Sequence, residues 1–87
     1  MSSVVLYGVG SPIIVDFEAS LERAGVAVAA AIQNLDGDIY VLDRTKLCTL
    51  ASLPSRATGL PFLVPLFTPA NRQRAAREAA DHGFLRP

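Results

Sequence analysis

Two glycines spaced by one residue, Gly8 and Gly10, follow the apolar run Val4–Tyr7 and precede Ser11. In nucleotide-binding units that join a strand to a helix, such glycines make a tight turn and let a phosphate approach the backbone. The start of the helix adds unpaired N–H groups and the positive end of a dipole. The spacing therefore predicts that backbone amides of Gly8, Gly10 and Ser11 bind phosphate. Ile13 replaces the third glycine of the dinucleotide fingerprint, so a loop that only packs the helix on a sheet is the alternative.

The end of the second predicted strand carries amide side chains where a nucleotide would place its ribose. Dinucleotide-binding folds use Asp or Glu at this place to bind the sugar hydroxyls. Here the residues are Gln33 and Asn34, which we expect to hydrogen-bond a ribose hydroxyl or the edge of a base. Asp36 comes slightly later, but it precedes Gly37, and an Asp-Gly pair is explained by a turn alone.

The last predicted helix begins with polar and basic residues. Thr68 and Pro69 suit the N-cap and the first helical position. We expect Thr68, Asn71 and Arg72 to line this helix start, facing the glycine loop. Residues 1–43 carry six acids and one base, a net −5, whereas residues 44–87 carry seven bases and two acids, a net +5. Arg72 is therefore a candidate for holding an anion beside a helix N-terminus, with a solvated helix face as the simpler alternative.

Residues that usually carry covalent or metal chemistry are scarce. Cys48 is the single cysteine and His82 the single histidine, so neither an internal disulfide nor a cysteine–histidine metal cluster is predicted. Serine and threonine residues have no histidine and aspartate partners in a recognisable spacing, and paired carboxylates at usable positions are absent. The sequence thus favours a binding module over a complete enzyme.

Charge and hydropathy exclude several other classes. Eight basic and eight acidic residues give zero net charge, which offers no case for binding nucleic acid. The N-terminus lacks the basic region of a signal peptide, and the charge-free stretches 1–15 and 57–71 are interrupted by glycine or proline, so no membrane span is predicted. A lone cysteine suits a reducing compartment. We expect a cytoplasmic protein.

Short apolar runs alternate with segments of helical period, which predicts a single α/β domain over residues 1–87. Such an order implies a small Rossmann-like βαβ fold, with a mostly parallel sheet of about four strands flanked by helices. Ser11 is expected to cap the first helix and Gly25 to end it. Leu47, Leu50 and Leu53 suggest one or two further helical turns. The predicted strands are Val4–Tyr7, Val26–Ile32 and Phe62–Phe67, with a short strand or hairpin return at Ile39–Leu42 and a last strand starting at Phe84-Leu85. The predicted helices run from Ile13 to Ala24 and from Pro69 up to Gly83, which is expected to be the C′ residue.

Apolar residues make up 51% of the chain, more than a small domain usually buries by itself. Strands buried on both faces would take up much of this surplus. The rest predicts a covering partner, either a second copy in a homo-oligomer or a further domain.

Three blocks that span most of the chain carry a family resemblance. They are VVLYGVGSPIIVDF at Val4–Phe17, LERAGVAVAAAIQN at Leu21–Asn34 and LVPLFTPANRQRAAREAADHGF at Leu63–Phe84. In this order they resemble the N-terminal nucleotide-sugar-binding domain of bacterial sugar O- and N-acetyltransferases, the group of sialic-acid O-acetyltransferases and UDP-amino-sugar N-acetyltransferases. The resemblance implies that the chain binds a UDP-linked sugar and presents it to an acetyltransferase domain.

In that family a left-handed parallel β-helix follows, binds acetyl-CoA and supplies the catalytic histidine. Because the sequence stops at Pro87, the resemblance implies an excised domain or a stand-alone relative, with no acetyl-CoA site and no acetyl-transfer site of its own.

The sequence departs from the family pattern at three places. A histidine common after the glycine loop is replaced around Pro12, the acidic pair after the second strand is Gln33-Asn34, and the glycine expected before the last turn is Phe67. These differences leave two alternatives. One is a structural or interaction domain whose glycine loop is vestigial. The other is an NAD(P)-binding fragment, which the absent third glycine and ribose acid disfavour.

Overall fold

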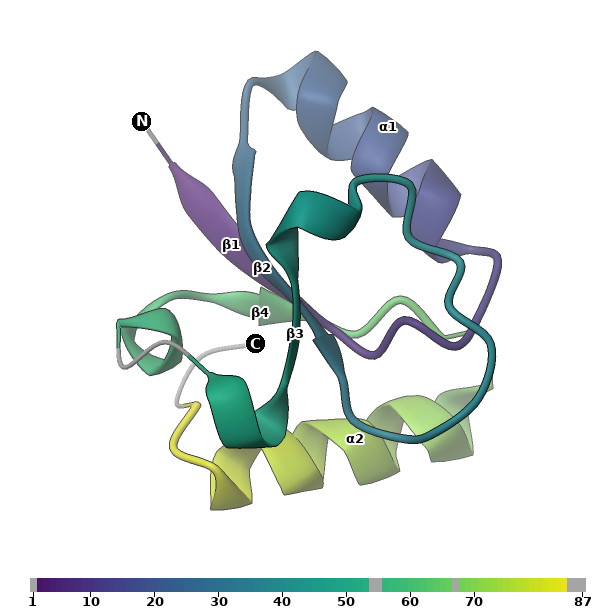
Figure 1. Ribbon diagram of the computed structural model, residues 1–87, viewed down its shortest axis with the longest axis vertical. Helices are drawn as coiled ribbons and strands as arrows, with labels where there is room; N and C mark the ends of the chain where they lie inside the picture. The colour runs from purple at the N-terminus through teal and green to yellow at the C-terminus, as the bar shows by residue number, and fades with distance from the viewer. Residues whose placement is uncertain (1, 54–55, 67, 85–87) are drawn as a thin grey trace.

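Four strands of the computed structural model form one parallel sheet with the order β3-β2-β1-β4 (Figure 1). The structure describes residues 2–53, 56–66 and 68–84. The predicted α/β, Rossmann-like fold with about four parallel strands is confirmed. Short 3₁₀ helices lie at Arg44–Lys46, Leu50–Ser52 and Ala57–Gly59, and the main elements are β1 (Ser3–Tyr7), α1 (Ile14–Ala24), β2 (Ala27–Gln33), β3 (Leu47–Thr49), β4 (Phe62–Leu63) and α2 (Pro69–Asp81).

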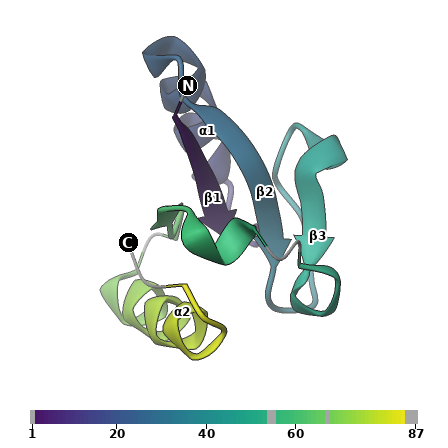
Figure 2. The same ribbon diagram turned by 90° about the vertical axis from the view of Figure 1, so that its left-hand side faces the viewer.

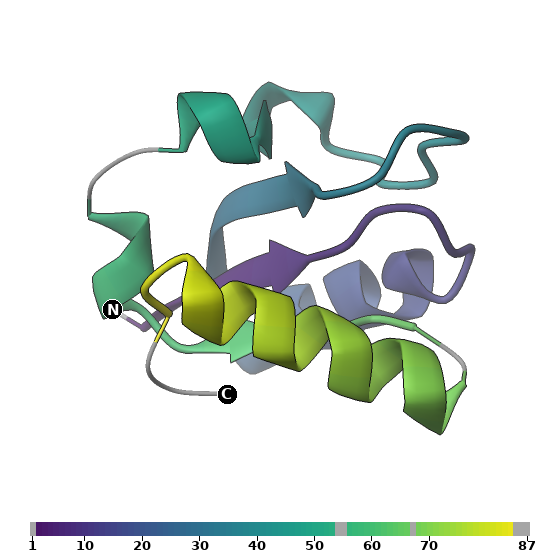
Figure 3. The ribbon, with the colours of Figure 1, turned by 90° about the horizontal axis from the view of Figure 1, so that it is seen from below.

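The two α-helices cover opposite faces of the sheet (Figures 2 and 3). Val5 and Tyr7 of β1 pack in a buried cluster with Ala75 and Ala79 of α2. Leu6 points to the other face, where a second buried cluster includes Ile14 of α1 and Val41. Since both faces are covered, apolar residues occupy consecutive positions in β1, as expected for a parallel sheet.

One irregularity interrupts the pairing of β1 with β2. Val4 pairs with Val28, whereas Val5 pairs with Ala30, so Ala29 is an extra residue in β2. Ala29 is exposed, while Ala30 and Ile32 are buried on the α2 face and Ala31 on the α1 face. After the extra residue of such a bulge, the side chains of the strand again alternate between the two faces of the sheet.

The helix ends follow the local sequence, with one correction. Gly25 ends α1 at φ 72°, a left-handed conformation that favours glycine, as predicted. Thr68 caps α2, as predicted, by accepting a 3.4 Å hydrogen bond from the Asn71 N–H to its hydroxyl. The prediction that Ser11 caps α1 is wrong, because the N-cap is Ile13, which makes no side-chain cap hydrogen bond. None of the helices in the described segments has the length and apolar character needed to cross a bilayer.

The segment between β2 and β4 differs most from the prediction. Ile39–Leu42 is not a strand, because its backbone makes no ladder with another strand. Instead, the Tyr40 N–H bonds the Val9 carbonyl at 3.0 Å, and the Leu42 N–H bonds the Glu18 carboxylate. The third strand is Leu47–Thr49, which pairs with the end of β2. The helical turns suggested by Leu47, Leu50 and Leu53 are reduced to the 3₁₀ helix Leu50–Ser52.

The strand expected over Phe62–Phe67 is only two residues long in the described segment. Pro65 has no N–H to add to the ladder, and the Leu66 N–H bonds the Val64 carbonyl in a tight turn. Phe84 starts no strand; it is buried in the core, and its N–H bonds the Ala79 carbonyl. The parts of these predictions that concern Phe67 and Leu85 lie outside the described residues.

Candidate functional site

A cleft of about 310 Å³ lies at the carboxyl edge of the sheet. The chain passes from β1 to β2 to β3 in one direction and then places β4 on the other side of β1. In open α/β sheets, ligands bind outside the carboxyl ends of the strands where the order reverses in this way. The cleft lies at this point, between the loops after β1, β2 and β4 and the first turns of α2, which Figure 3 shows gathered at one end of the sheet. Its lining residues are Gly10, Asn34, Leu35, Asp36, Asp38, Leu66, Asn71, Arg74, Ala75 and Glu78.

A broader hollow of about 500 Å³ runs along the outer face of α2, from Ala70 to Asp81. It is lined by that helix alone, so its groups do not converge on a ligand from several directions. The cleft is the better site, because a binding pocket needs polar groups that converge from different elements.

Gly8 forms the turn beneath the cleft. Its φ of 105° lies in the region that favours glycine, and a Cβ there would lie 3.7 Å from both Oδ1 of Asn34 and Cδ2 of Leu66. The Gly8 N–H bonds the Ile32 carbonyl at 2.9 Å. This amide, which the sequence predicted to bind phosphate, therefore already has a partner in the sheet.

The rest of the glycine loop offers fewer free amides than the sequence suggested. The Ile14, Val15 and Asp16 amides bond the carbonyls of the three residues at 11–13, and the Ser11 hydroxyl lies 3.5 Å from the Ile13 nitrogen. Gly10 is exposed and lines the cleft, whereas Ser11 is buried. Within the described residues, the amides of Gly10 and Ser11 donate no hydrogen bond, but of the two residues only Gly10 lines the cleft, so its amide is the one open to a ligand there.

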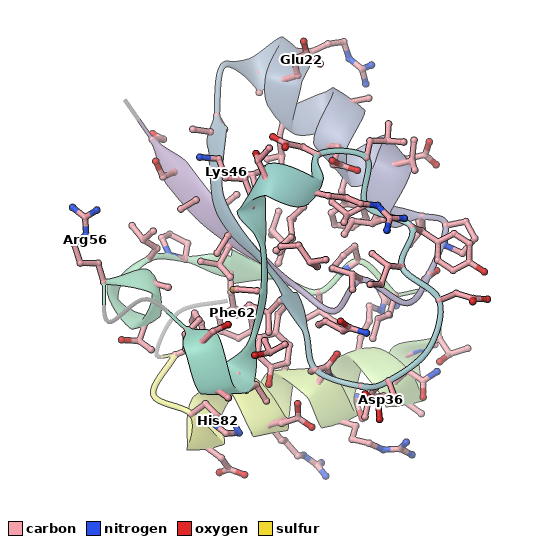
Figure 4. The ribbon with its side chains drawn as sticks, viewed as in Figure 1. Glu22, Asp36, Lys46, Arg56, Phe62 and His82 are labelled. Atoms are coloured by element: carbon pink, nitrogen blue, oxygen red, sulfur yellow. The ribbon has the colours of Figure 1, made fainter. Side chains whose placement is uncertain are left out.

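Of the two amide side chains at the end of β2, one lines the cleft and the other does not. Asn34 lines the cleft, directly above Gly8. Gln33 pairs with Thr49 at the end of the β2–β3 ladder and does not line the cleft. Asp36, which a turn alone would explain, lines the cleft as well, and Figure 4 shows it where the loop after β2 passes α2.

Helix α2 presents a different arginine to the cleft from the one expected. Asn71 lines the cleft, but Arg72 lines a separate apolar hollow of about 330 Å³ beside β4, formed mainly by Phe62, Leu63, Val64 and Ala76. One step along a helix rotates a side chain by about 100°, so Arg74 shares the face of Asn71. The sequence reasoning missed Arg74 and Glu78. The helical spacing of positions 71, 74, 75 and 78 puts these residues on one face of the helix, but the spacing alone does not show that this face borders the cleft.

A buried tyrosine holds one carboxylate of the cleft in place. The Tyr7 hydroxyl donates a 2.7 Å hydrogen bond to Oε1 of Glu78. The Tyr7 ring is fully buried and makes edge-on contacts with Phe62 and Phe84, at centroid distances of 6.3 and 5.8 Å. Burial, the hydrogen bond to Glu78 and the nearby carboxylates raise the pKa of Tyr7 above its ordinary value. Tyr7 is therefore neutral and a hydrogen-bond donor at any physiological pH.

Among the described residues, the charged groups of the cleft are three carboxylates and one guanidinium, from Asp36, Asp38, Glu78 and Arg74. Together with the amides of Asn34 and Asn71, they supply many acceptors and few cationic donors. This set suits a ligand rich in hydroxyl or N–H donors better than a purely anionic one. Across the described segments, no three His, Cys, Asp or Glu side chains are grouped closely enough to hold a metal ion.

Comparison with known proteins identifies no relative: no family model, no curated protein and no solved structure matches the chain.

Proposed function

We propose that the chain binds a nucleotide-linked sugar, with the sugar-containing part in the cleft at the carboxyl edge of the sheet. The observation that carries this proposal is the convergence of Gly10, Asn34 and α2 on one cleft where the strand order reverses. The cleft volume of about 310 Å³ suits part of such a ligand, with the remainder lying over the glycine loop.

The polar groups match the two parts of a nucleotide-sugar. Asn34, Asn71 and the three carboxylates offer acceptors for sugar hydroxyls. The Gly10 amide and the Arg74 guanidinium line the cleft and are the donors for a pyrophosphate. Acetyl-CoA has no part in this proposal, since the family that the sequence resembles binds it in a separate β-helix domain.

Two arginines of α2 provide a matched test by calorimetric titration with UDP and UDP-N-acetylglucosamine. Arg74→Ala removes the one cation that the described residues place in the cleft, so binding should weaken at least about tenfold. Arg72→Ala changes the same residue type two positions earlier, outside the cleft, and should alter affinity less than about twofold. Failure of the unchanged protein to bind either compound, with no thermal shift, would overturn the proposal. Tighter binding of NADH than of the UDP compounds would favour a dinucleotide site instead.

The second candidate function is an interaction domain whose glycine loop no longer binds a ligand. The excess of carboxylates in the cleft favours it, because a pyrophosphate would meet three negative charges there. The apolar hollow beside β4 adds a surface suited to protein contact. This alternative predicts that neither the unchanged protein nor Arg74→Ala binds UDP, UDP-N-acetylglucosamine or NADH in the same titrations.

A further inference from the structure

The Tyr7–Glu78 hydrogen bond fixes a negative charge at the edge of the cleft. Glu78 lies on α2 where it borders both the cleft and the outer hollow of that helix. A glutamate there has two directions open to it, inward to the cleft or outward to solvent. The 2.7 Å bond from the Tyr7 hydroxyl to Oε1 holds the carboxylate on the inner side. Tyr7 itself cannot move, because its ring is fully buried against Phe62 and Phe84.

The charged residues around Glu78 determine which sugars its carboxylate can accept. Asp36 and Asp38 line the same cleft from the loop after β2, and Arg74 is the single cation among its described lining residues. If the pyrophosphate of a ligand pairs with Arg74, no cation of the cleft is left to neutralise a further anion. A hydroxyl or N–H group of the sugar can donate to the second oxygen of Glu78, whereas a sugar carboxylate would be repelled.

We infer that Glu78, oriented by Tyr7, makes the cleft selective for nucleotide-sugars with an uncharged or amino-bearing sugar, and excludes those with an acidic sugar. This inference rests on the proposed function and adds the substrate class to it. Tyr7 acts as a positioning residue, because the ring is buried and reaches the cleft only through Glu78.

The test compares two ligands that share the nucleotide and the pyrophosphate, UDP-glucose and UDP-glucuronate, which differ only in whether the last sugar carbon is an alcohol or a carboxylate. The unchanged protein should bind UDP-glucose at least about tenfold more tightly than UDP-glucuronate. Glu78→Gln keeps the size and an acceptor for the Tyr7 hydroxyl but removes the charge. It should reduce this ratio to within about threefold by improving the binding of UDP-glucuronate.

Tyr7→Phe should reduce the same ratio while leaving Glu78 charged, because the carboxylate is then free to turn outward. Asp81→Asn is the control: it removes a carboxylate of α2 that borders only the outer hollow, and the ratio should not change. If Tyr7→Phe does not fold, the ratio of the two affinities in Glu78→Gln alone tests the inference.

The outcomes separate this inference from the proposed function. Equal binding of both ligands by the unchanged protein, or an undiminished ratio in Glu78→Gln, overturns the selectivity while nucleotide-sugar binding stands. Binding of neither ligand overturns the proposed function, and the inference fails with it.

Discussion

Single residues set the shape of the glycine loop, and Gly8 is the position whose backbone conformation most requires a glycine. At a φ of 105° any other residue is strained, although a Cβ would meet only ordinary contacts at 3.7 Å. We expect Gly8→Ala to lower the free energy of unfolding by about 1–3 kcal/mol through the backbone alone. Urea denaturation followed by circular dichroism measures this.

Gly10→Ala is the control for that change. Gly10 has no left-handed φ, and a Cβ would lie 3.8 Å from the Asp38 carbonyl oxygen. The free energy of unfolding of this variant should change by less than about 0.5 kcal/mol, although the added methyl group enters the cleft. Equal losses in the two variants would contradict this account of the loop.

Tyr7 links stability to alkaline pH. Its pKa is raised in the folded protein, so the folded state keeps a proton that the unfolded state releases near pH 10. The stabilisation from neutral Tyr7 is therefore complete below about pH 10 and is lost as the pH rises toward the folded pKa, by up to about 1.4 kcal/mol per pH unit.

Tyr7→Phe keeps the aromatic packing and removes this titration. It should be less stable by about 1–2 kcal/mol at neutral pH, since a charge-assisted hydrogen bond is lost. Its deficit relative to the unchanged protein should shrink in denaturant titrations between about pH 9 and about pH 11. A deficit that is constant across that range would contradict the assigned titration.

Among the elements, α1 does more than cover the sheet. The Glu18 carboxylate accepts hydrogen bonds from the Leu42 N–H at 2.8 Å and the Asp43 N–H at 3.1 Å. These bonds tie the long connection after β2 to α1 and help to keep Val41 buried. The connection has no ladder of its own, so a helix side chain replaces the missing backbone partners.

Glu18→Ala should loosen this connection without unfolding the sheet. Losing two hydrogen bonds to a carboxylate costs about 1–2 kcal/mol locally, so exchange of the Leu42 and Asp43 amides should be about 5–30 times faster. Glu22→Ala, one turn along the same helix, is the control, because its side chain accepts no hydrogen bond from the described residues. Hydrogen exchange followed by NMR distinguishes the two variants.

The sequence predicted the elements whose signals are local. Gly25 and the Thr68-Pro69 pair mark helix ends through their own backbone preferences, and these boundaries are confirmed. By contrast, Leu47–Thr49 is a strand because β2 offers it a ladder, which no local pattern reveals. The leucine spacing there favoured a helix, and tertiary pairing overrode that preference.

The residues of the candidate site likewise fall into those that local sequence signals predict and those that depend on tertiary packing. Gly10, Asn34 and Asn71 were predicted and do line one cleft, because each follows an element whose end the sequence marks. Arg74 and Glu78 were missed because their orientation depends on which face of α2 packs on the sheet. The buried alanines Ala75 and Ala79 decide that face.

For the molecule as a whole, the surplus of apolar residues is mostly accounted for by the two buried faces of the sheet. In the part of the chain that the structure describes, the large apolar side chains left exposed are Leu35, Tyr40 and Leu42. All three lie on the connection after β2. Leu35 and Leu42 keep 70% and 71% of their surface exposed, which makes this connection the surface best suited to contact with another molecule.

We therefore predict that the chain self-associates through this connection. Sedimentation equilibrium should show a concentration-dependent dimer that Leu42→Ser weakens, because the exposed apolar surface is reduced. Ala51→Ser, at an exposed apolar residue outside the connection, should leave the dimer unchanged. A monomer at every concentration would contradict the prediction.

The extra residue in β2 bears on how this chain tolerates a change in its length. Ala29 stands outside the ladder, between a valine that pairs with Val4 and an alanine that pairs with Val5. Its deletion would join Val28 to Ala30, and the alternation between the two faces would continue without a break. In most strands, losing one residue exchanges the inward and outward side chains. Here every buried side chain of β2 would stay on its own face, so this end of the sheet can absorb a one-residue deletion without any change at the cleft.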